Sequence, residues 1–502
     1  MTLLNSVISW LIKKRIHQIE LFKKYPLDVQ QEVFTKLIQS AKDTEWGKKY
    51  DYKSIRNIND FKSRVPISDY ESIKPWIERI MKGEQNLLWP SEIKWFAKSS
   101  GTTNDKSKFI PVSNEAIEEC HIKGGKDLLA IYYNNYPNAK IFDGKTLALG
   151  GSHKIIEINS KAYYGDLSAI LIQNLPFWAE FKRIPNLSIA LMEEWENKIK
   201  LIAKTSINSD VTCLAGVPSW TLILLRKIIE ITGKNDISEI WPNLEVFFHG
   251  GVDFTPYHKQ FTKIISSPNM HYINNYNASE GFFGIQDQTE SDELLLMLDY
   301  GIFYEFIPIE NINDNNPDSL SLSDVKTNKN YAMIISTNAG LWRYIIGDTI
   351  KFTSLNPYRI IISGRTKHFI NAVGEELIVE NADKAITIAC QKTNAIINEY
   401  TVAPIYFDDN KNAAHEWLIE FEQQPHNMEI FADVLDNAIK SQNSDYEAKR
   451  YHNLILRAPI IKSIPKGTFY KWLKYKGKLG GQHKVPRLSN NRKIIDEILN
   501  LI

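Results

Sequence analysis

The sequence is poor in cysteine and in net charge. Its 502 residues include three cysteines, Cys120, Cys213 and Cys390, which lie far apart and form neither a disulfide framework nor a CxxC metal pair. The net charge is +1, from 60 Lys and Arg against 59 Asp and Glu, and gives no argument for a nucleic-acid or membrane partner of the whole protein. These absences exclude a disulfide-stapled secreted domain and indicate a reducing compartment, so we expect a cytoplasmic protein.

Long apolar runs are also absent. No stretch reaches the roughly 18 consecutive apolar residues that a membrane-spanning helix needs, so no integral membrane span is expected. The uncharged segment 1–12 is shorter, and its basic residues 13–15 follow it, whereas those of a secretory signal precede the apolar part. We interpret this segment as an amphipathic helix docked on the protein, with a membrane-surface anchor as the alternative.

What is present predicts a mixed α/β (α+β) fold. The hydrophobic content of 43%, with 23 Tyr, 22 Phe and 12 Trp, excludes a disordered chain. Apolar spacing near 3.6 residues predicts helices, and short apolar or β-branched runs predict strands. The predicted helices are 114–133, 188–204, 219–232, 380–392 and 428–441. The predicted strands are 93–97, 109–112, 244–248, 294–298, 302–308, 331–337, 358–363, 401–407, 417–421 and 454–457.

The pattern changes after Gly364, which indicates two domains. We expect a large N-terminal domain over 1–363, with β-sheets flanked by helices, and a small α+β C-terminal domain over 364–502. Part of the second domain is strongly basic: residues 449–493 contain 13 Lys and Arg and no Asp or Glu. Such a run either attracts a polyanion or forms a solvated basic surface.

The most informative segment is Lys98–Lys108, KSSGTTNDKSK, between two predicted strands. Four hydroxyls around Gly101, followed by two lysines, are suited to hold a polyphosphate, because glycine lets backbone amides turn inward and the ammonium groups neutralise charge. A polar turn is the alternative. The segment is not a Walker loop, and the G-x-G-x-x-G, H-E-x-x-H and G-x-S-x-G motifs are absent from the chain.

The Ser-Ser-Gly-Thr-Thr run, its lysine and the following Phe-Ile-Pro-Val resemble the phosphate-binding loop of the firefly-luciferase-like acyl-adenylate-forming superfamily. Within it, the segment is most similar to the auxin-responsive Gretchen Hagen family of acyl-acid amido synthetases. Further segments resemble this family's motifs in order and extend the resemblance over most of the chain. They are Phe248–Gly251, Tyr276–Gly281, Trp342–Asp348, Ser363–Glu375, Gly467–Phe469 and Gln482–Arg487.

The resemblance implies an ATP site and an adenylate-forming, ATP- and acyl-acid-binding N-terminal domain. Asp348 would accept the ribose hydroxyls, Glu280 would hold Mg²⁺ on ATP oxygens, and Tyr276 would stack beside adenine. Each residue has a structural alternative, such as a turn former, a core tyrosine or a surface carboxylate. The implied cofactor-binding residues are Ser99, Ser100, Gly101, Thr102, Thr103, Lys108, Gly250, Gly251, Tyr276, Ser279, Glu280, Arg343, Asp348 and Arg365.

Two lysines of the mobile C-terminal domain compete for one catalytic role, which is to neutralise charge that builds between the substrate carboxylate and the α-phosphate. Resemblance to the family's terminal segment favours Lys484. Lys471, which follows Pro465–Phe469, fits the wider superfamily. We expect one of the two to be structural.

The implied activity is that of a ligase. ATP and Mg²⁺ would activate a carboxylic acid as an acyl-adenylate, and an amine, expected to be an amino acid, would take the acyl group. One alternative is an acyl-CoA ligase with a thiol acceptor. Another is a non-catalytic nucleotide- or nucleic-acid-binding protein, against which the balanced charge of the remaining chain argues. The sequence identifies neither the acid nor the oligomeric state, and we expect acid specificity to come from the helices at 114–133 and 188–232.

Overall fold

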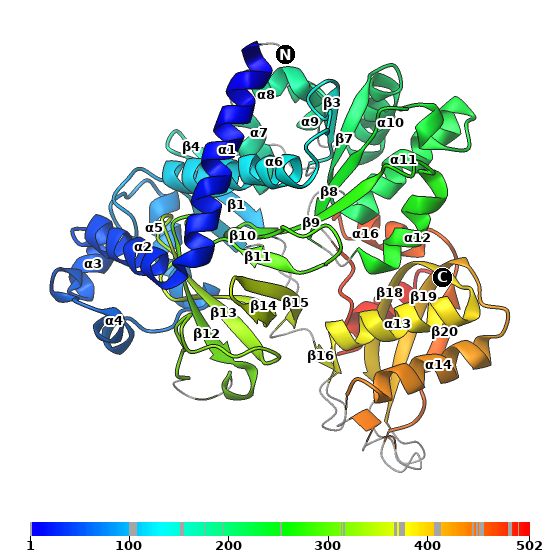
Figure 1. Cartoon of the computed structure of the whole chain (residues 1–502). Helices are drawn as coiled ribbons and strands as arrows, with labels where there is room; N and C mark the ends of the chain where they lie inside the picture. Colours follow the sequence, from blue (N-terminus) through cyan, green and yellow to red (C-terminus); the bar gives the residue numbers. More distant parts are fainter. Residues whose placement is uncertain are drawn as a thin grey trace. The chain divides into compact units, whose positions relative to one another are not determined.

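The computed structural model shows a chain with two compact units (Figure 1). The first unit comprises Met1–Gly251 and Ser267–Ile361, and the second comprises Val252–Ser266 and Ile362–Ile502. The described residues are 3–99, 108–150, 155–175, 177–192, 194–251, 254–312, 314, 317–365, 369–370, 377–405, 413–443, 446–447, 450, 456–479, 484–489 and 491–502.

The first unit begins with helices. They are α1 (Leu3–Lys24), α2 (Pro26–Ala41), α3 (Glu45–Lys49), α4 (Ile58–Arg64) and α5 (Tyr70–Met81), with a 3-10 turn η1 (Tyr52–Ser54). Side chains at Thr44, Asn57 and Asp69 each accept a backbone N–H of the helix that follows. These caps satisfy amide groups that have no partner inside a helix, which explains why α3, α4 and α5 start where they do.

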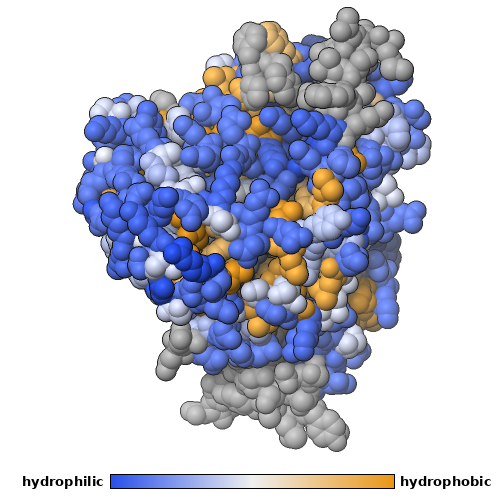
Figure 2. All heavy atoms as spheres, turned by 60° about the vertical axis from the view of Figure 1, so that its left-hand side comes forward, coloured by the Kyte–Doolittle hydropathy of each residue, from blue (hydrophilic) through white to orange (hydrophobic). Residues whose placement is uncertain are grey.

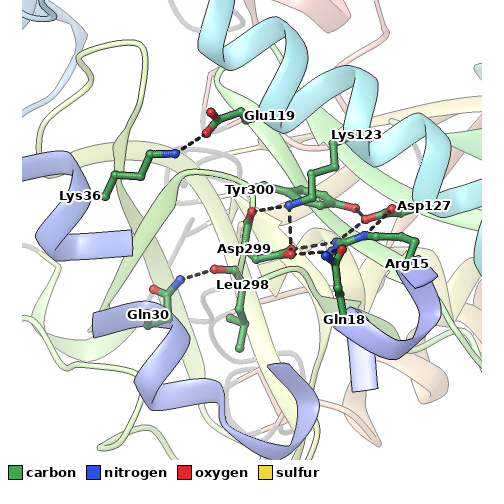
Figure 3. A network of polar contacts seen from close by, with 10 residues as sticks. All are labelled: Arg15, Gln18, Gln30, Lys36, Glu119, Lys123, Asp127, Leu298, Asp299 and Tyr300. Atoms are coloured by element: carbon green, nitrogen blue, oxygen red, sulfur yellow. Dashed lines mark hydrogen bonds and ion pairs between the residues drawn. The ribbon is translucent and has the colours of Figure 1, made fainter. Parts of the chain in front are cut away.

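Helix α1 is fastened to the first unit by an ion-pair network, which Figure 3 shows. Arg15 donates to Asp127 of α6 (Lys123–Asn135) at 2.6 and 2.7 Å and to Asp299 at 2.7 and 3.0 Å. Tyr300 donates its hydroxyl to the same Asp127 carboxylate at 2.7 Å. A planar guanidinium suits such paired contacts. The segment 1–12, predicted as a docked helix, forms the start of α1 from Leu3, and its side chains up to residue 11 lie outside the described residues, so these contacts show docking of α1 only at Arg15.

A sheet of 11 strands runs through the first unit in the order β12-β13-β14-β15-β11-β10-β9-β8-β7-β3-β6. Its strands are β3 (Lys145–Ala148), β6 (Arg183–Ile184), β7 (Val211–Gly216), β8 (Val246–Gly250), β9 (His271–Ala278), β10 (Gly281–Gln286), β11 (Leu294–Leu296), β12 (Ile302–Pro308), β13 (Asn330–Thr337), β14 (Tyr344–Leu355) and β15 (Tyr358–Arg365). Strand β9 is parallel to β8 and antiparallel to β10. Ligands in parallel sheets bind beyond the carboxyl ends of strands, at points where the topology switches, which directs attention to the ends of β8 and β9.

A second sheet of the first unit has four strands in the order β2-β1-β5-β4. They are β1 (Trp95–Ser99), β2 (Lys108–Val112), β4 (Ile156–Asn159) and β5 (Ala162–Gly165). The remaining helical segments are the π-helix η2 (Ala116–Ile122), α6, α7 (Leu167–Gln173), α8 (Phe177–Lys182), α9 (Leu187–Ala190), α10 (Trp195–Ser206), α11 (Pro218–Thr232), η3 (Ile237–Glu239) and η4 (Ile309–Asn311). Helix α11 ends at Gly233, whose φ of 67° is left-handed, as the sequence predicts.

The second unit is a compact α+β structure. Its three-stranded sheet has the order β18-β19-β20, and Figure 1 shows α13 and α14 lying across it. Tyr400 and Trp417 stack in its core with ring centroids 5.5 Å apart. The elements are α12 (Thr255–Ile264), β16 (Phe369–Ile370), β17 (Leu377–Ile378), α13 (Val379–Thr393), β18 (Ile396–Ile405), β19 (Ala414–Gln423), α14 (Met428–Lys440), β20 (Ile460–Ile464), α16 (Thr468–Tyr475) and α17 (Lys493–Leu499).

Three segments differ from their predictions in the type or number of elements, and others differ in their bounds. Residues 114–133, predicted as one α-helix, form the π-helix η2 and then α6. Residues 188–204 form two helices, because α9 ends at Ala190 and the Glu194 side chain caps α10 by accepting two backbone N–H groups. The strand predicted over 454–457 is a single bridge between Leu456 and Ala413, with residues 454 and 455 outside the described part of the chain.

The surface is mostly hydrophilic on the face that Figure 2 shows, with apolar residues gathered in limited areas. Scattered exposed apolar residues are normal for a globular protein. Among the helices in the described part of the chain, none is long and apolar enough to cross a membrane.

Candidate active site

The carboxyl end of β8 carries two consecutive glycines, Gly250 and Gly251. Gly250 is paired with Asn275 of β9, and a Cβ added to Gly250 would lie 2.5 Å from the Asn275 carbonyl oxygen. Gly251 has a φ of 79°, a conformation that side-chain-bearing residues rarely adopt. The neighbouring backbone of β9 therefore excludes a side chain at Gly250.

Strand β9 bears Tyr276, which contacts Asp348, another residue of the candidate site. The Tyr276 hydroxyl donates to Asp348 Oδ2 at 2.7 Å, and the Tyr276 ring packs against Phe283 at 4.9 Å between centroids. Tyr276 and Asp348 are 4% and 7% exposed. The bond joins β9 to β14, which are not neighbours in the sheet. One carboxylate is thus held in a fixed orientation by a buried hydroxyl.

Asp348 lies within a strand and is not a turn former, the structural alternative to its ribose role. It belongs to β14, and the preceding Gly347 has a φ of 94°. The β13–β14 pairing shifts register at this level, between Ala332 and Ile334. The glycine and the register shift lie next to Asp348. Together they interrupt the regular alternation of side chains along the strand at this residue.

The turn between β9 and β10 brings a carboxylate and unused hydroxyls to the same neighbourhood. Burial raises the pKa of Tyr344 well above its ordinary value, and the negative charge of Glu280 raises it further. In the described part of the chain, the hydroxyls of Ser279 and Tyr344 are buried without a hydrogen-bond partner. Buried hydroxyls normally have partners, so these two are suited to receive a ligand.

Lys108 approaches this neighbourhood from the four-stranded sheet. Its Nζ lies 5.7 Å above the ring centroid of Tyr70, whose hydroxyl accepts the Phe109 N–H at 2.9 Å. The pKa of Tyr344 is also raised by the nearby Tyr70. Lys108 and Tyr70 are therefore neighbours. Sequence reasoning missed Tyr70, and nothing in its local sequence distinguishes it.

The hydroxyl-rich loop connects two paired strand ends. Ser99 of β1 and Lys108 of β2 are register partners in an antiparallel pair. The loop therefore leaves β1 at Ser99 and enters β2 at Lys108, the residue whose Nζ lies over the Tyr70 ring. The predicted site residues Ser100, Gly101, Thr102 and Thr103 lie outside the described residues, as do the side chains of Ser99 and Arg365.

Arg343 has structural contacts only among the described residues. Its Nε and one Nη2 hydrogen donate to the Glu305 carboxylate at 3.1 Å each. The other donors bind the carbonyl oxygens of Lys62 and Val65 and the Ser319 hydroxyl at 2.6 to 3.0 Å. A guanidinium has five N–H donors, and all five are used. These contacts favour a structural role over the predicted nucleotide role, because no donor is left for a phosphate or a ribose.

The two candidate lysines belong to the second unit. Lys471 lies in α16 with an exposed side chain, and Lys484 is half-buried three residues before Arg487. The Arg487 guanidinium packs over the Tyr400 ring at 4.5 Å, and its carbonyl accepts the Val402 N–H at 2.8 Å. The segment that bears Lys484 is therefore held along β18, whereas Lys471 projects from a helix.

A metal site made by protein side chains alone is not found within the described ranges, where no group of three or more His, Cys, Asp or Glu residues could hold an ion. Mg²⁺ in nucleotide sites takes one or two carboxylates and completes its shell with phosphate oxygens and water. Glu280, next to the unpartnered hydroxyl of Ser279, fits that donor set, because both residues offer hard oxygen ligands.

Relatives of the chain are named amide-forming enzymes. The sequence matches the GH3 family N-terminal domain over residues 15–270, the central domain over 295–365 and the C-terminal domain over 380–493. Indole-3-acetic acid-amido synthetase GH3.3 of Arabidopsis thaliana is 22% identical over 91% of this chain and 89% of that protein. Jasmonoyl-L-amino acid synthetase JAR4 of Nicotiana attenuata is 22% identical over 94% and 92%.

Solved structures show the same fold. GH3.15 acyl acid amido synthetase superposes with a TM-score of 0.79 at 16% identity, covering 96% of this chain and 95% of that one. A 2-hydroxyisobutyryl-CoA ligase in its postadenylation state superposes with a TM-score of 0.61 at 11% identity, covering 94% and 91%. The predicted α/β (α+β) fold and the predicted family resemblance are confirmed. The chain belongs to the GH3 family.

Proposed function

We propose that the protein is an acyl-acid amido synthetase. It activates a carboxylic acid with ATP, releasing pyrophosphate, and transfers the acyl group of the acyl-adenylate to the amine of an amino acid, releasing AMP. Adenylation replaces a poor leaving group on the acyl carbon by a good one, which divides a difficult step into two easier ones. The names of the relatives support the amide product, and the Tyr276–Asp348 hydrogen bond at the carboxyl edge of β8 and β9 carries the site assignment.

The nucleotide would lie along this edge. Adenine would approach the Gly250–Gly251 backbone, and Asp348, oriented by Tyr276, would accept the ribose hydroxyls. The phosphates would meet Lys108, Ser279 and the hydroxyl-rich loop over 99–103. This assignment is supported by the buried Ser279 hydroxyl, which has no partner among the described residues.

Charge compensation would come from two directions. Glu280 would bind Mg²⁺ that is shared with phosphate oxygens. One lysine of the proposed C-terminal domain, Lys484 or Lys471, would neutralise the charge that develops between the carboxylate and the α-phosphate. We retain 1–363 and 364–502 as the proposed functional domains, with the smaller one moving about Ser363–Arg365 to deliver this lysine.

Product analysis tests the proposal. The protein is incubated with ATP, Mg²⁺, a panel of carboxylic acids and an equimolar mixture of amino acids and coenzyme A, and the products are identified by mass spectrometry. An amide together with AMP is the expected result. A thioester without amide would instead establish an acyl-CoA ligase, and neither product from folded protein would refute both.

A carboxylate substitution tests the nucleotide site. Asp348→Ala should abolish ATP binding measured by calorimetry, whereas Asp292→Ala, at an exposed position of the same unit, should leave it unchanged. Equal ATP affinity in the two variants would contradict the ribose role of Asp348.

A further inference from the structure

Arg487, which ends the last of the family-like motifs, lies at the centre of a polar network in the second unit. Its guanidinium forms an ion pair with Glu399 of β18, donates to the Tyr257 hydroxyl at 3.1 Å and donates to the Tyr400 carbonyl oxygen at 3.3 Å. The Arg487 side chain is 12% exposed, so these contacts are largely shielded from water. Lys484 comes three residues earlier, and the network therefore bears on how that lysine is held.

The tyrosine of this network comes from a distant part of the sequence. Tyr257 lies in α12, which follows β8 and precedes β9 along the chain but belongs to the second unit by its contacts. Its hydroxyl accepts from Arg487 and donates to Glu399 Oε2 at 3.3 Å. Gln260, one turn further along α12, donates to the Ile397 carbonyl oxygen of β18. Tyr257 and Gln260 are 2% and 3% exposed, so buried polar contacts fasten α12 to β18.

The terminal segment that bears Lys484 runs along the same strand. The Val402 N–H donates to the Arg487 carbonyl oxygen at 2.8 Å, and the Ser489 N–H donates to the Val402 carbonyl oxygen at 3.0 Å. These main-chain bonds hold the backbone of segment 484–489 on β18, and the Arg487 side chain joins the same segment to α12.

Lys471 has a different setting. It lies on α16 with an exposed side chain, whereas Lys484 is half-buried in a segment fixed by Arg487. A group that must meet charge developing at one place acts best when its own position is fixed in advance. This difference favours Lys484 for the role that the two lysines share.

We propose that Arg487 and Tyr257 are positioning residues, which hold Lys484 where it neutralises the charge between the substrate carboxylate and the α-phosphate. The inference rests on the proposed function and assigns its catalytic lysine to Lys484. Arg487 and Tyr257 act through that lysine and not on the substrate. It follows that α12 and segment 484–489 form one body, although more than 200 residues separate them in the sequence.

The kinetics of ATP–pyrophosphate exchange with an accepted acid test the inference. Tyr257→Phe removes the hydroxyl that links Arg487 to α12, and kcat should fall about tenfold, the size expected for one hydrogen bond to a charged group, while the KM for ATP is unchanged. Arg487→Met should lower kcat about 100-fold, because a misplacement of about 1 Å can cost that much.

Arg492→Met is the matched control. Arg492 is another arginine of the terminal segment, and it donates to Glu416 at 2.6 Å, outside the network of Arg487. Glu416 keeps its second partner, Lys462, at 2.7 Å when Arg492 is replaced. The control variant should therefore fold and keep the wild-type kcat.

A double-mutant cycle shows whether the effect passes through Lys484. In the Lys484→Met background, Tyr257→Phe should have no further effect on kcat, because residues that act through one group are not additive. In the Lys471→Met background, Tyr257→Phe should keep its full effect. A network with a merely structural role would slow both backgrounds alike.

Hydrogen exchange measured by mass spectrometry gives a readout without turnover. In Arg487→Met, the backbone amides of α12 and of residues 484–489 should exchange faster together, whereas those of α14 should be unchanged. If Arg487→Met does not fold, the same measurement is made on Tyr257→Phe, which keeps the ring and its packing. Faster exchange in only one of the two segments would contradict the single body.

The kinetic results separate the inference from the proposed function. A wild-type kcat in Tyr257→Phe, equal losses in the two lysine backgrounds, or unimpaired ATP–pyrophosphate exchange in Lys484→Met would each overturn the inference and leave the amido synthetase intact. Absence of ATP–pyrophosphate exchange with any acid in the wild-type protein would overturn the proposed function and the inference with it.

Discussion

Tyr276→Phe tests how the candidate nucleotide site is organised. The substitution removes the hydroxyl that donates to Asp348 at 2.7 Å and keeps the ring against Phe283. A hydrogen bond to a charged group contributes about 1.5–3 kcal/mol. If the bond orients Asp348 toward ribose, this energy appears in nucleotide affinity. Since about 1.4 kcal/mol is tenfold, the Kd for ATP should rise roughly 10- to 100-fold.

A double-mutant cycle separates orientation from simple loss of a contact. Calorimetry with ATP is performed on wild-type protein, Tyr276→Phe, Asp348→Asn and the double variant. Residues that act through one hydrogen bond are non-additive, so the second substitution should add little to the first, with a coupling of about 1.5 kcal/mol or more. The energy of the hydroxyl is then assigned to its effect on Asp348.

Tyr304→Phe is the matched control. It removes another fully buried tyrosine hydroxyl, which donates to the Met297 carbonyl oxygen at 3.1 Å and has no part in the site. It should lower the free energy of unfolding by about 1 kcal/mol and leave the Kd for ATP unchanged. Unchanged ATP affinity in Tyr276→Phe, or additive effects in the cycle, would refute the role given to this pair.

Further substitutions address other parts of the account. Arg343→Met leaves Glu305 buried without its cationic partner, so the free energy of unfolding in urea should fall by about 3–5 kcal/mol. The Kd of the folded protein for ATP should be unchanged, and a changed Kd would return Arg343 to the nucleotide site. Because burial of the His121 imidazole lowers its pKa to about 4, the unfolded chain binds more protons between about pH 6.5 and pH 4, and up to about 3 kcal/mol of stability should be lost as the pH falls through this window. His121→Leu should remove that part of the pH dependence of urea unfolding, and an unaltered pH dependence would show that His121 is not the group that titrates. One of the two substitutions Lys484→Met and Lys471→Met should lower the rate of ATP–pyrophosphate exchange by about 100-fold or more, and the other should lower it by little, because one charge is needed at the α-phosphate. Equal losses in the two variants would contradict a single catalytic lysine.

Elements with strong local signals were predicted closely. Strand β12 was predicted as 302–308 and has those bounds, because an apolar run buried on both faces needs no distant information. Helix α11 ends before Gly233, where a left-handed glycine stops the helix regardless of tertiary context. The π-helix η2 was missed, because its apolar spacing resembles that of an α-helix and its wider turn accompanies packing on Phe282.

The sequence predicted candidate residues of the site but not the hydrogen bonds that join them. The order of motifs placed Gly250, Glu280 and Asp348 on one list of candidates, and the structure brings all three to the first unit. The Tyr276–Asp348 bond spans 72 residues, and no local pattern encodes it. Arg343 shows the reverse case: its motif suggested a ligand, whereas its acceptors come from distant segments that only the folded chain assembles.

Acid-dependent ATP–pyrophosphate exchange is the most direct test of the central claim. Folded protein with ATP, Mg²⁺ and labelled pyrophosphate is assayed with and without each acid of a broad panel. Label should enter ATP only when an accepted acid is present, and Asp348→Ala should abolish this incorporation. Protein that binds ATP but exchanges no label with any acid would contradict the proposed adenylation.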